Sequence, residues 1–162
     1  MGQVIHDWKV LSSALEGYRA AGKKIVSTNG VFDVLHVGHA RYLQAARNLG
    51  DCLVVGVNSD ICTRNLKGPD RPFVPEAERM ELLAALACVD FVTVFDEPTP
   101  EALLEVVRPH LHAKGGDYHL ALLPETVVVQ RHGGEVVTIP FQEGYSTTLL
   151  SERIADILAQ RE

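Results

Sequence analysis

The chain has 162 residues and a formal net charge of −6 at pH 7, with 46% hydrophobic and 22% charged residues. These values predict one globular domain, residues 1–162, and argue against a general nucleic-acid-binding protein, which would carry a basic surface. No apolar run approaches the 18 residues of a membrane span, and the first eight residues do not resemble a signal peptide, so we expect a cytoplasmic protein with no membrane contact.

Strands and helices are predicted to alternate along the chain. Short β-branched runs predict strands near residues 24–28, 52–57, 89–95, 111–114 and 135–140. Apolar residues at helical spacing predict helices around residues 11–18, 37–46, 75–87, 99–108, 122–132 and 146–160. This alternation predicts a Rossmann-like, doubly wound α/β fold with a five-stranded parallel sheet. The strand order that we expect for this sheet is 3-2-1-4-5.

Two of these helices carry more detailed expectations. Thr99 is the expected N-cap of the helix over residues 99–108, because its hydroxyl can accept from a free backbone N–H group. The closing helix is amphipathic and is expected to bury one apolar side. The side chains on that side are Leu149, Leu150, Ile154, Ile157 and Leu158.

The most specific motif runs from Thr28 to His39, from the first strand through a glycine turn into the second helix. A helix N-terminus presents unpaired N–H groups and the positive end of the helix dipole, so it binds phosphate readily. His36 and His39 at this point could stabilise the charge that develops on a reacting phosphoryl group. The segment therefore predicts an enzyme that acts on a nucleotide phosphate.

Two further polar segments follow later strands. Residues 114–118 read Lys-Gly-Gly-Asp-Tyr, and residues 143–148 read Glu-Gly-Tyr-Ser-Thr-Thr. In the expected strand order, the loops after the first, fourth and fifth strands meet at the carboxyl edge of the sheet, where such folds bind ligands. All three segments are thus predicted to line one crevice.

The first motif resembles the nucleotidylyltransferase superfamily pattern Gly-x-Phe-Asp-x-x-His-x-Gly-His. The matching residues are Gly30, Phe32, Asp33, His36, Gly38 and His39. Together with Leu-Lys-Gly-Pro-Asp-Arg-Pro at residues 66–72 and the two later segments, the chain resembles the heptose 1-phosphate adenylyltransferase family from about residue 23 to residue 157. The resemblance implies transfer of AMP from ATP to heptose 1-phosphate, giving ADP-heptose for lipopolysaccharide. Many members are fused behind a sugar kinase, and we expect this chain to be the stand-alone form.

The resemblance also implies roles for individual residues. The expected catalytic residues are His36, His39 and Lys67, with Lys67 on a loop that closes over the phosphates. The expected nucleotide-binding residues are Asn29, Gly30, Phe32, Gly38, Arg79, Gly144, Tyr145, Ser146, Thr147 and Thr148. The expected substrate-binding residues are Asp33, Lys114 and Asp117. The three hydroxyl groups at residues 146–148 could both cap the last helix and bind phosphate.

No carboxylate cluster looks like a dedicated metal cage, so Mg²⁺ is expected to be held mainly by ATP and no metal ligand is assigned. ATP and a sugar 1-phosphate are the expected partners, and the resemblance makes a homodimer plausible. Two alternatives stay open. One is a cytidylyltransferase acting on glycerol 3-phosphate or a phosphorylated amino alcohol, and the other is a non-catalytic nucleotide-binding module. The roles of Asp60 and His112 are also open.

Overall fold

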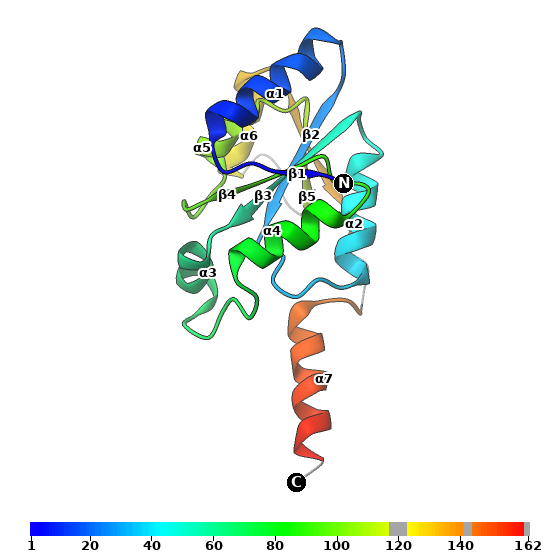
Figure 1. Cartoon of the computed structure of the whole chain (residues 1–162), viewed down its shortest axis with the longest axis vertical. Helices are drawn as coiled ribbons and strands as arrows, with labels where there is room; N and C mark the ends of the chain where they lie inside the picture. Colours follow the sequence, from blue (N-terminus) through cyan, green and yellow to red (C-terminus); the bar gives the residue numbers. More distant parts are fainter. Residues whose placement is uncertain (117–122, 141–143, 161–162) are drawn as a thin grey trace.

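A six-stranded parallel sheet forms the centre of the molecule (Figure 1). The computed structural model describes residues 1–116, 123–140 and 144–160. The strands are β1 (Gln3–Val4), β2 (Ile25–Gly30), β3 (Cys52–Asn58), β4 (Phe91–Phe95), β5 (Leu111–Gly115) and β6 (Glu135–Ile139). Their order across the sheet is β1-β4-β3-β2-β5-β6. The carboxyl ends of these parallel strands therefore lie along one edge.

The expected Rossmann-like arrangement is found, but the number of strands was wrong. Strands β2 to β6 have the predicted relative order, and β1 adds a sixth strand beside β4. This strand has only two residues, both exposed, so it carries no alternating or apolar pattern that a sequence could reveal. Its pairing places the N-terminus against the sheet without altering the carboxyl edge beside β2 and β5.

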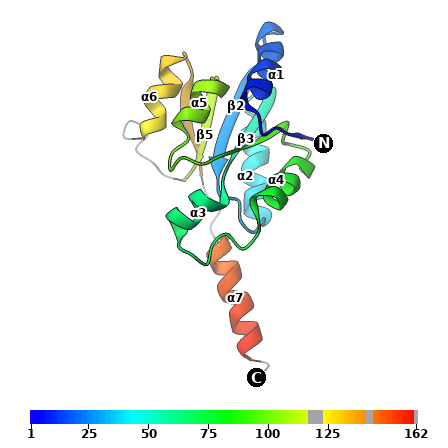
Figure 2. The same ribbon diagram turned by 60° about the vertical axis from the view of Figure 1, so that its left-hand side comes forward.

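Helices cover both faces of the sheet, and Figure 2 shows α2 and α4 on one side and α5 and α6 on the other. The helices are α1 (Trp8–Ala20), α2 (Val37–Arg47), α3 (Asp60–Lys67), α4 (Glu76–Ala85), α5 (Glu101–Val107), α6 (Pro124–Arg131) and α7 (Thr147–Ala159). Successive strand residues face opposite sides. Val26 and Val55 accordingly pack with the α2 and α4 side, whereas Ile25 and Val54 pack with the α1 and α5 side.

Two local predictions about helices need correction. Helix α3 was not expected, although Ser59 caps it by accepting a hydrogen bond from the Cys62 backbone N–H at 3.1 Å. Helix α5 begins after Pro100 rather than after a Thr99 cap. The Thr99 hydroxyl instead donates to the Glu101 carboxylate at 2.6 Å, so it is not available to the backbone.

Helix α7 does not bury the side that was expected to face inward. It extends away from the sheet in both views (Figures 1 and 2), and none of its 13 residues, all within the described part of the chain, is buried. Leu149, Ile154, Ile157 and Leu158 are exposed. The amphipathic pattern predicted the helix correctly but could not specify a surface for it to cover. No helix in the described ranges is long and apolar enough to cross a lipid bilayer.

Candidate active site

A cavity of about 510 Å³ lies at the carboxyl ends of β2, β3, β5 and β6. Its walls include Asn29, Asn58, Lys114 and Ile139, one from each of these strands. The histidine segment and the start of α7 complete the walls. This is the crevice that the strand order predicted for a ligand.

Most of the predicted site residues line this one cavity. They are Asn29, Gly30, Phe32, Asp33, His36, Gly38, His39, Lys67, Lys114, Tyr145, Ser146, Thr147 and Thr148. Arg79 and Gly144 are not among the lining residues. Asp117 lies outside the described residues. The three motifs therefore converge although they are separated by up to 120 residues in the sequence.

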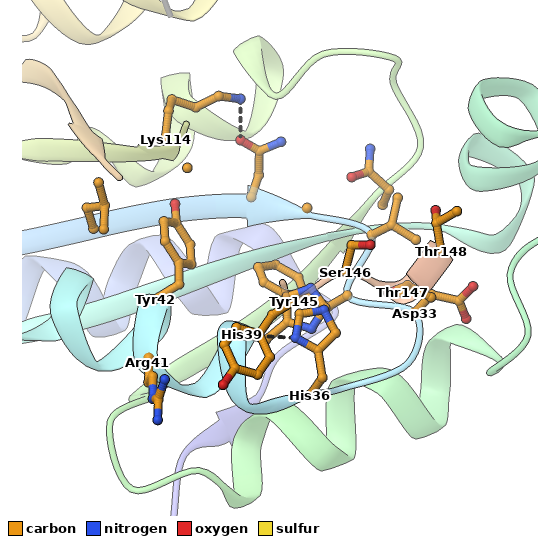
Figure 3. A pocket seen from close by; sticks show the side chains of 18 of the residues that line it. Asp33, His36, His39, Arg41, Tyr42, Lys114, Tyr145, Ser146, Thr147 and Thr148 are labelled. Atoms are coloured by element: carbon orange, nitrogen blue, oxygen red, sulfur yellow. Dashed lines mark hydrogen bonds between the residues drawn. The ribbon is translucent and has the colours of Figure 1, made fainter. Parts of the chain in front are cut away.

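The two histidines lie together at the start of α2. His36 is the N-cap residue, and its Nδ1 accepts a hydrogen bond from the His39 backbone N–H at 3.4 Å. The rings are stacked with centroids 3.8 Å apart, and the Phe32 ring meets the His39 ring edge-on at 5.4 Å. Figure 3 shows both rings beside Tyr145 and Ser146. The capping contact thus fixes His36 while the aromatic contacts fix His39.

Glycine is needed between these histidines. A Cβ atom at Gly38 would lie 2.8 Å from the Tyr145 Cβ atom and 3.0 Å from the His36 Cε1 atom. Both contacts are shorter than packed carbon atoms tolerate, so a side chain here would displace the histidine loop or the segment before α7. The absence of a side chain at Gly38 therefore allows the start of α2 and the segment before α7 to approach closely.

Both histidines are held in the neutral form at neutral pH. Burial, followed by the neighbouring His36 ring, lowers the pKa of His39 to about 4. Burial also lowers the pKa of His36. The His39 Nδ1 atom is buried and has no hydrogen-bond partner among the described residues. The pair therefore offers neutral imidazole groups for hydrogen bonding rather than a permanent positive charge.

Asp33 anchors the loop that joins α3 to α4. Its two carboxylate oxygens accept from the Arg71 Nε atom at 2.7 Å and from the backbone N–H groups of Phe73 and Val74 at 2.8 and 2.9 Å. The Asp33 side chain is nearly completely buried. This geometry favours a role in holding the loop against the histidine segment over direct contact with a substrate.

Arg79 has a comparable structural position and is fully buried. Its guanidinium donates to the carbonyl of Val31, to that of Val74 at 2.9 Å, and to that of Asn58 at 2.9 Å. It also forms an ion pair with Asp60, with 2.8 Å between the Arg79 Nη2 and Asp60 Oδ1 atoms. The Asp60 side chain, whose role the sequence left open, is thus a partner of this buried arginine. Arg79 thus joins the histidine segment to the end of β3 and to the α3–α4 loop, and the structure does not bring it to the cavity.

Among the described residues, three cationic side chains besides Lys114 line the cavity. Lys67 is exposed and lines the cavity as the last residue of α3 rather than from a loop. Arg71 and Arg41 also line it, and neither was singled out from the sequence. Arg71 lies in the same segment, residues 66–72, as Lys67, so the sequence could have indicated it as a second cationic residue of the site. Ser146 caps α7 by accepting from the Leu149 N–H at 3.1 Å, as a hydroxyl at that position should.

Lys114 lines the cavity from β5. Its ammonium group is 2.8 Å from the Glu125 carboxylate on α6 and donates to the Asn29 side-chain oxygen at 3.4 Å. Figure 3 shows Lys114 well separated from His36 and His39. Glu125 was not identified from the sequence, because nothing about a lone glutamate predicts burial.

His112 lies on β5 below Lys114 and is buried. Its Nδ1 atom is 2.8 Å from the Ser27 hydroxyl oxygen, and its Nε2 atom has no partner among the described residues. Burial, followed by the nearby charge of Lys114, lowers the pKa of His112 to about 3. It is therefore a neutral core residue and does not line the cavity.

Across the residues that the structure describes, no group of three or more His, Cys, Asp or Glu side chains could hold a metal ion. Asp33, which lines the cavity, is paired with Arg71, and Glu125 is paired with the lining residue Lys114. A divalent cation at this site would need oxygen ligands supplied by the substrate.

Comparison with known proteins finds relatives that match most of this chain. The family described as cytidylyltransferase-like matches residues 27–153. The bifunctional protein HldE of Syntrophotalea carbinolica is 53% identical over 150 residues, which are 90% of this chain and 30% of that protein. The bifunctional protein HldE of Streptomyces coelicolor is 52% identical over 138 residues, 85% of this chain and 30% of that protein. The chain thus spans about a third of the length of these relatives.

Two solved structures are similar in fold. The lipopolysaccharide core biosynthesis protein of Thermoplasma volcanium has a TM-score of 0.63 and 29% identity, covering 77% of this chain and 100% of that chain. Pantoate–β-alanine ligase of Francisella tularensis, solved with an ATP ligand and β-alanine, has a TM-score of 0.59 and 14% identity. That match covers 88% of this chain and 68% of the ligase. The second likeness extends to the fold alone.

Proposed function

Because the chain belongs to the cytidylyltransferase-like family, we propose that it transfers AMP from ATP to heptose 1-phosphate, forming ADP-heptose and pyrophosphate. One observation carries the proposal. The stacked His36 and His39 rings at the start of α2 share a cavity with the hydroxyl groups at the start of α7. Two helix N-termini that meet at one cavity form a site for a polyphosphate rather than for a single anion.

The reaction needs one displacement at phosphorus. An oxygen of the sugar phosphate attacks the α-phosphorus of ATP, a new O–P bond forms, and the bond from the α-phosphorus to the bridging oxygen breaks. The electron pair of that bond leaves with pyrophosphate. The attacking oxygen is already anionic at neutral pH, so no general base is required, and positioning and charge stabilisation supply the catalysis.

The chain's own groups suit that task. His36 and His39 are neutral in the free protein, so each can donate a ring N–H to phosphate oxygens as charge develops on them. Lys67 adds a positive charge to the cavity wall, and Arg71, whose charge is paired with Asp33, adds guanidinium donors. Ser146, Thr147 and Thr148 place hydroxyl and backbone donors at the start of α7, where they would bind the β- and γ-phosphates. Tyr145 would lie beside the nucleobase.

ATP would enter as its magnesium complex. The described residues offer no metal cage, so Mg²⁺ would belong to the substrate, be held by the phosphate oxygens and neutralise part of their charge.

The choice of sugar and base rests on resemblance. The segments at residues 66–72, 114–118 and 143–148 resemble the heptose 1-phosphate adenylyltransferase family. The likeness to a lipopolysaccharide core biosynthesis protein supports the same substrate class. The description of the matching family favours a second candidate, a cytidylyltransferase that uses glycerol 3-phosphate. Both candidates share the histidine site and the displacement at the α-phosphorus.

A two-by-two assay separates these candidates. Pyrophosphate release by the purified protein with Mg²⁺ is measured for ATP and CTP, each with heptose 1-phosphate and with glycerol 3-phosphate. Release only with ATP and heptose 1-phosphate supports the proposal. Release only with CTP and glycerol 3-phosphate replaces it with the second candidate. Nucleotide binding with no release from any pair contradicts both and leaves the binding-module alternative.

A further inference from the structure

Lys114 and Glu125 form an ion pair at the wall of the cavity, away from the histidines. The Lys114 Nζ atom lies 2.8 Å from the Glu125 Oε1 atom, and the exposed fractions of the two side chains are 17% and 4%. Glu125 lies in the first turn of α6, where the helix dipole favours a negative charge. Burying a carboxylate is unfavourable unless it is paired, so the ion pair with Glu125 holds the Lys114 side chain toward α6.

Lys114 also orients the side chain of Asn29 at the end of β2. Lys114 donates to the Asn29 Oδ1 atom at 3.4 Å, which directs the oxygen of that amide toward Lys114 and its nitrogen away. Within the described residues, the Asn29 Nδ2 group has no hydrogen-bond partner, and Asn29 lines the cavity. Glu125, Lys114 and Asn29 thus form a chain of contacts that ends in an oriented amide donor.

Two lysines that line the cavity differ in their charge partners. Lys67 lies four residues before Arg71, which pairs with Asp33 of the histidine segment, and Lys67 takes part in no ion pair with another described residue. The charge of Lys114 is matched by that of Glu125. A phosphate group gains more from the unmatched charge of Lys67 than from the matched charge of Lys114. The paired ammonium of Lys114 and the oriented amide of Asn29 suit uncharged hydroxyl groups.

We propose that Glu125 is a positioning residue for the acceptor substrate, holding Lys114 and through it Asn29 so that these two residues bind hydroxyl groups of the sugar. The inference rests on the proposed sugar phosphate transfer. It assigns Lys114 to the sugar ring rather than to the sugar phosphate, which the part of the cavity beside the histidines binds. Glu125 itself does not line the cavity and acts only through Lys114.

The test begins with Glu125→Gln, which keeps the shape and removes the charge. The KM for heptose 1-phosphate is expected to rise about tenfold, the usual effect of losing one hydrogen bond to a charged group, with kcat and the KM for ATP changed less than about twofold. The matched control is Glu105→Gln, because Glu105 also forms an ion pair with α6, through Arg131, but does not line the cavity. It should leave all three constants unchanged. If Glu125→Gln lowered kcat and raised both KM values by similar factors, the role of Glu125 would be merely structural and the proposal would be overturned.

A double-mutant cycle tests whether Glu125 acts through Lys114. In a Lys114→Met background, Glu125→Gln should produce no further rise in the KM for heptose 1-phosphate. Additive effects would contradict the positioning role. Inhibition by heptose without phosphate and by inorganic phosphate tests what Lys114 binds. If Glu125→Gln weakens inhibition by heptose but not by inorganic phosphate, Lys114 binds hydroxyl groups. If it weakens inhibition by inorganic phosphate but not by heptose, the proposal is overturned. Failure of the wild-type protein to use heptose 1-phosphate would count against the proposed function instead.

Discussion

The His36 ring lies over the His39 ring with centroids 3.8 Å apart and an angle of 21° between the planes. This contact joins a helix-capping residue to a residue one turn further along the same helix. His36 is held by its hydrogen bond to the His39 backbone, so the position of each ring depends on the other. The two side chains therefore form one structural unit, to which we assign phosphate binding as part of the proposed function.

Replacing either histidine is expected to remove turnover and leave the fold intact. Loss of one preorganised donor costs roughly 3–4 kcal/mol of transition-state stabilisation, so His36→Ala and His39→Ala should each lower kcat about 10²–10³-fold. Pyrophosphate release measures kcat, and urea unfolding measures stability. His6→Ala is the control, because His6 is exposed and does not line the cavity. Near-wild-type turnover in either active-site variant would rule out the mechanism.

Replacing Arg79 is expected to lower stability before it affects nucleotide use. Its guanidinium contacts the carbonyls of Val31, Val74 and Asn58 and the carboxylate of Asp60. Removing a buried charged partner of this kind costs about 3–5 kcal/mol, so Arg79→Met should lower the free energy of unfolding by that order. Urea titration at pH 7 measures the change. Wild-type stability together with a raised KM for ATP in this variant would instead support the nucleotide contact that the family resemblance implies for Arg79.

Lys67 and Thr147 should contribute to nucleotide use with little effect on stability. Both line the cavity, and the Lys67 side chain is exposed. Lys67→Ala and Thr147→Ala are therefore expected to raise the KM for ATP about tenfold, the effect of one charge-assisted hydrogen bond, with unfolding free energies within about 0.5 kcal/mol of wild type. Lys9→Ala is the matched control, because Lys9 is an exposed residue of α1. An unchanged kcat together with an unchanged KM for ATP in Lys67→Ala would place this lysine outside the reaction.

Stability should fall in mild acid because of buried neutral histidines. The pKa of His112 is lowered to about 3 and that of His39 to about 4, both below the value of about 6.5 expected for unfolded chains. Each therefore stabilises the fold fully above pH 6.5, and that stability is lost as the pH falls toward the folded-state pKa. The slope is roughly 1.4 kcal/mol per pH unit for each histidine.

The paired variant Ser27→Ala with His112→Leu isolates one of these histidines. Removing both members of the buried Ser27–His112 hydrogen bond is expected to change stability little at pH 7, because no polar partner is left unpaired. The loss of unfolding free energy between pH 6.5 and pH 5 should be smaller than in the wild type by roughly 2 kcal/mol. Urea titrations at the two pH values give both quantities. An unchanged loss would mean that His112 is protonated in the folded protein.

The sequence was most informative where the contacts are local or repeat regularly. The histidine segment could be identified because its strand, turn and helix start are consecutive residues. The parallel arrangement of β2 to β6 follows from alternating strands and helices, and their relative order is the one expected for this fold type. Helix α3 was missed although Ser59 before Asp60 is a usual start signal. The two-residue β1 gave no pattern that could be recognised.

Tertiary contacts decided what the sequence could not. Arg79 matches a family position for nucleotide contact, yet its partners Val31 and Asn58 are 48 and 21 residues away, and only the fold shows that they surround it. Glu125 is paired with Lys114 across α6 and β5, and local propensity contains no information on such a pair. The apolar side of α7 was identified correctly as a pattern, but a pattern does not name the surface that covers it.

The exposure of α7 has a consequence for ligand affinity. Helices of about this length are marginal in water without packing, so the order of α7 depends on what binds at its ends. A ligand that contacts Ser146, Thr147 and Thr148 must supply the free energy that holds the first turn of this helix. The conformational entropy that α7 loses on binding therefore weakens the affinity for the ligand, and a more stable α7 would strengthen it. Substitutions on its far turns could tune that affinity without changing any atom that a nucleotide touches.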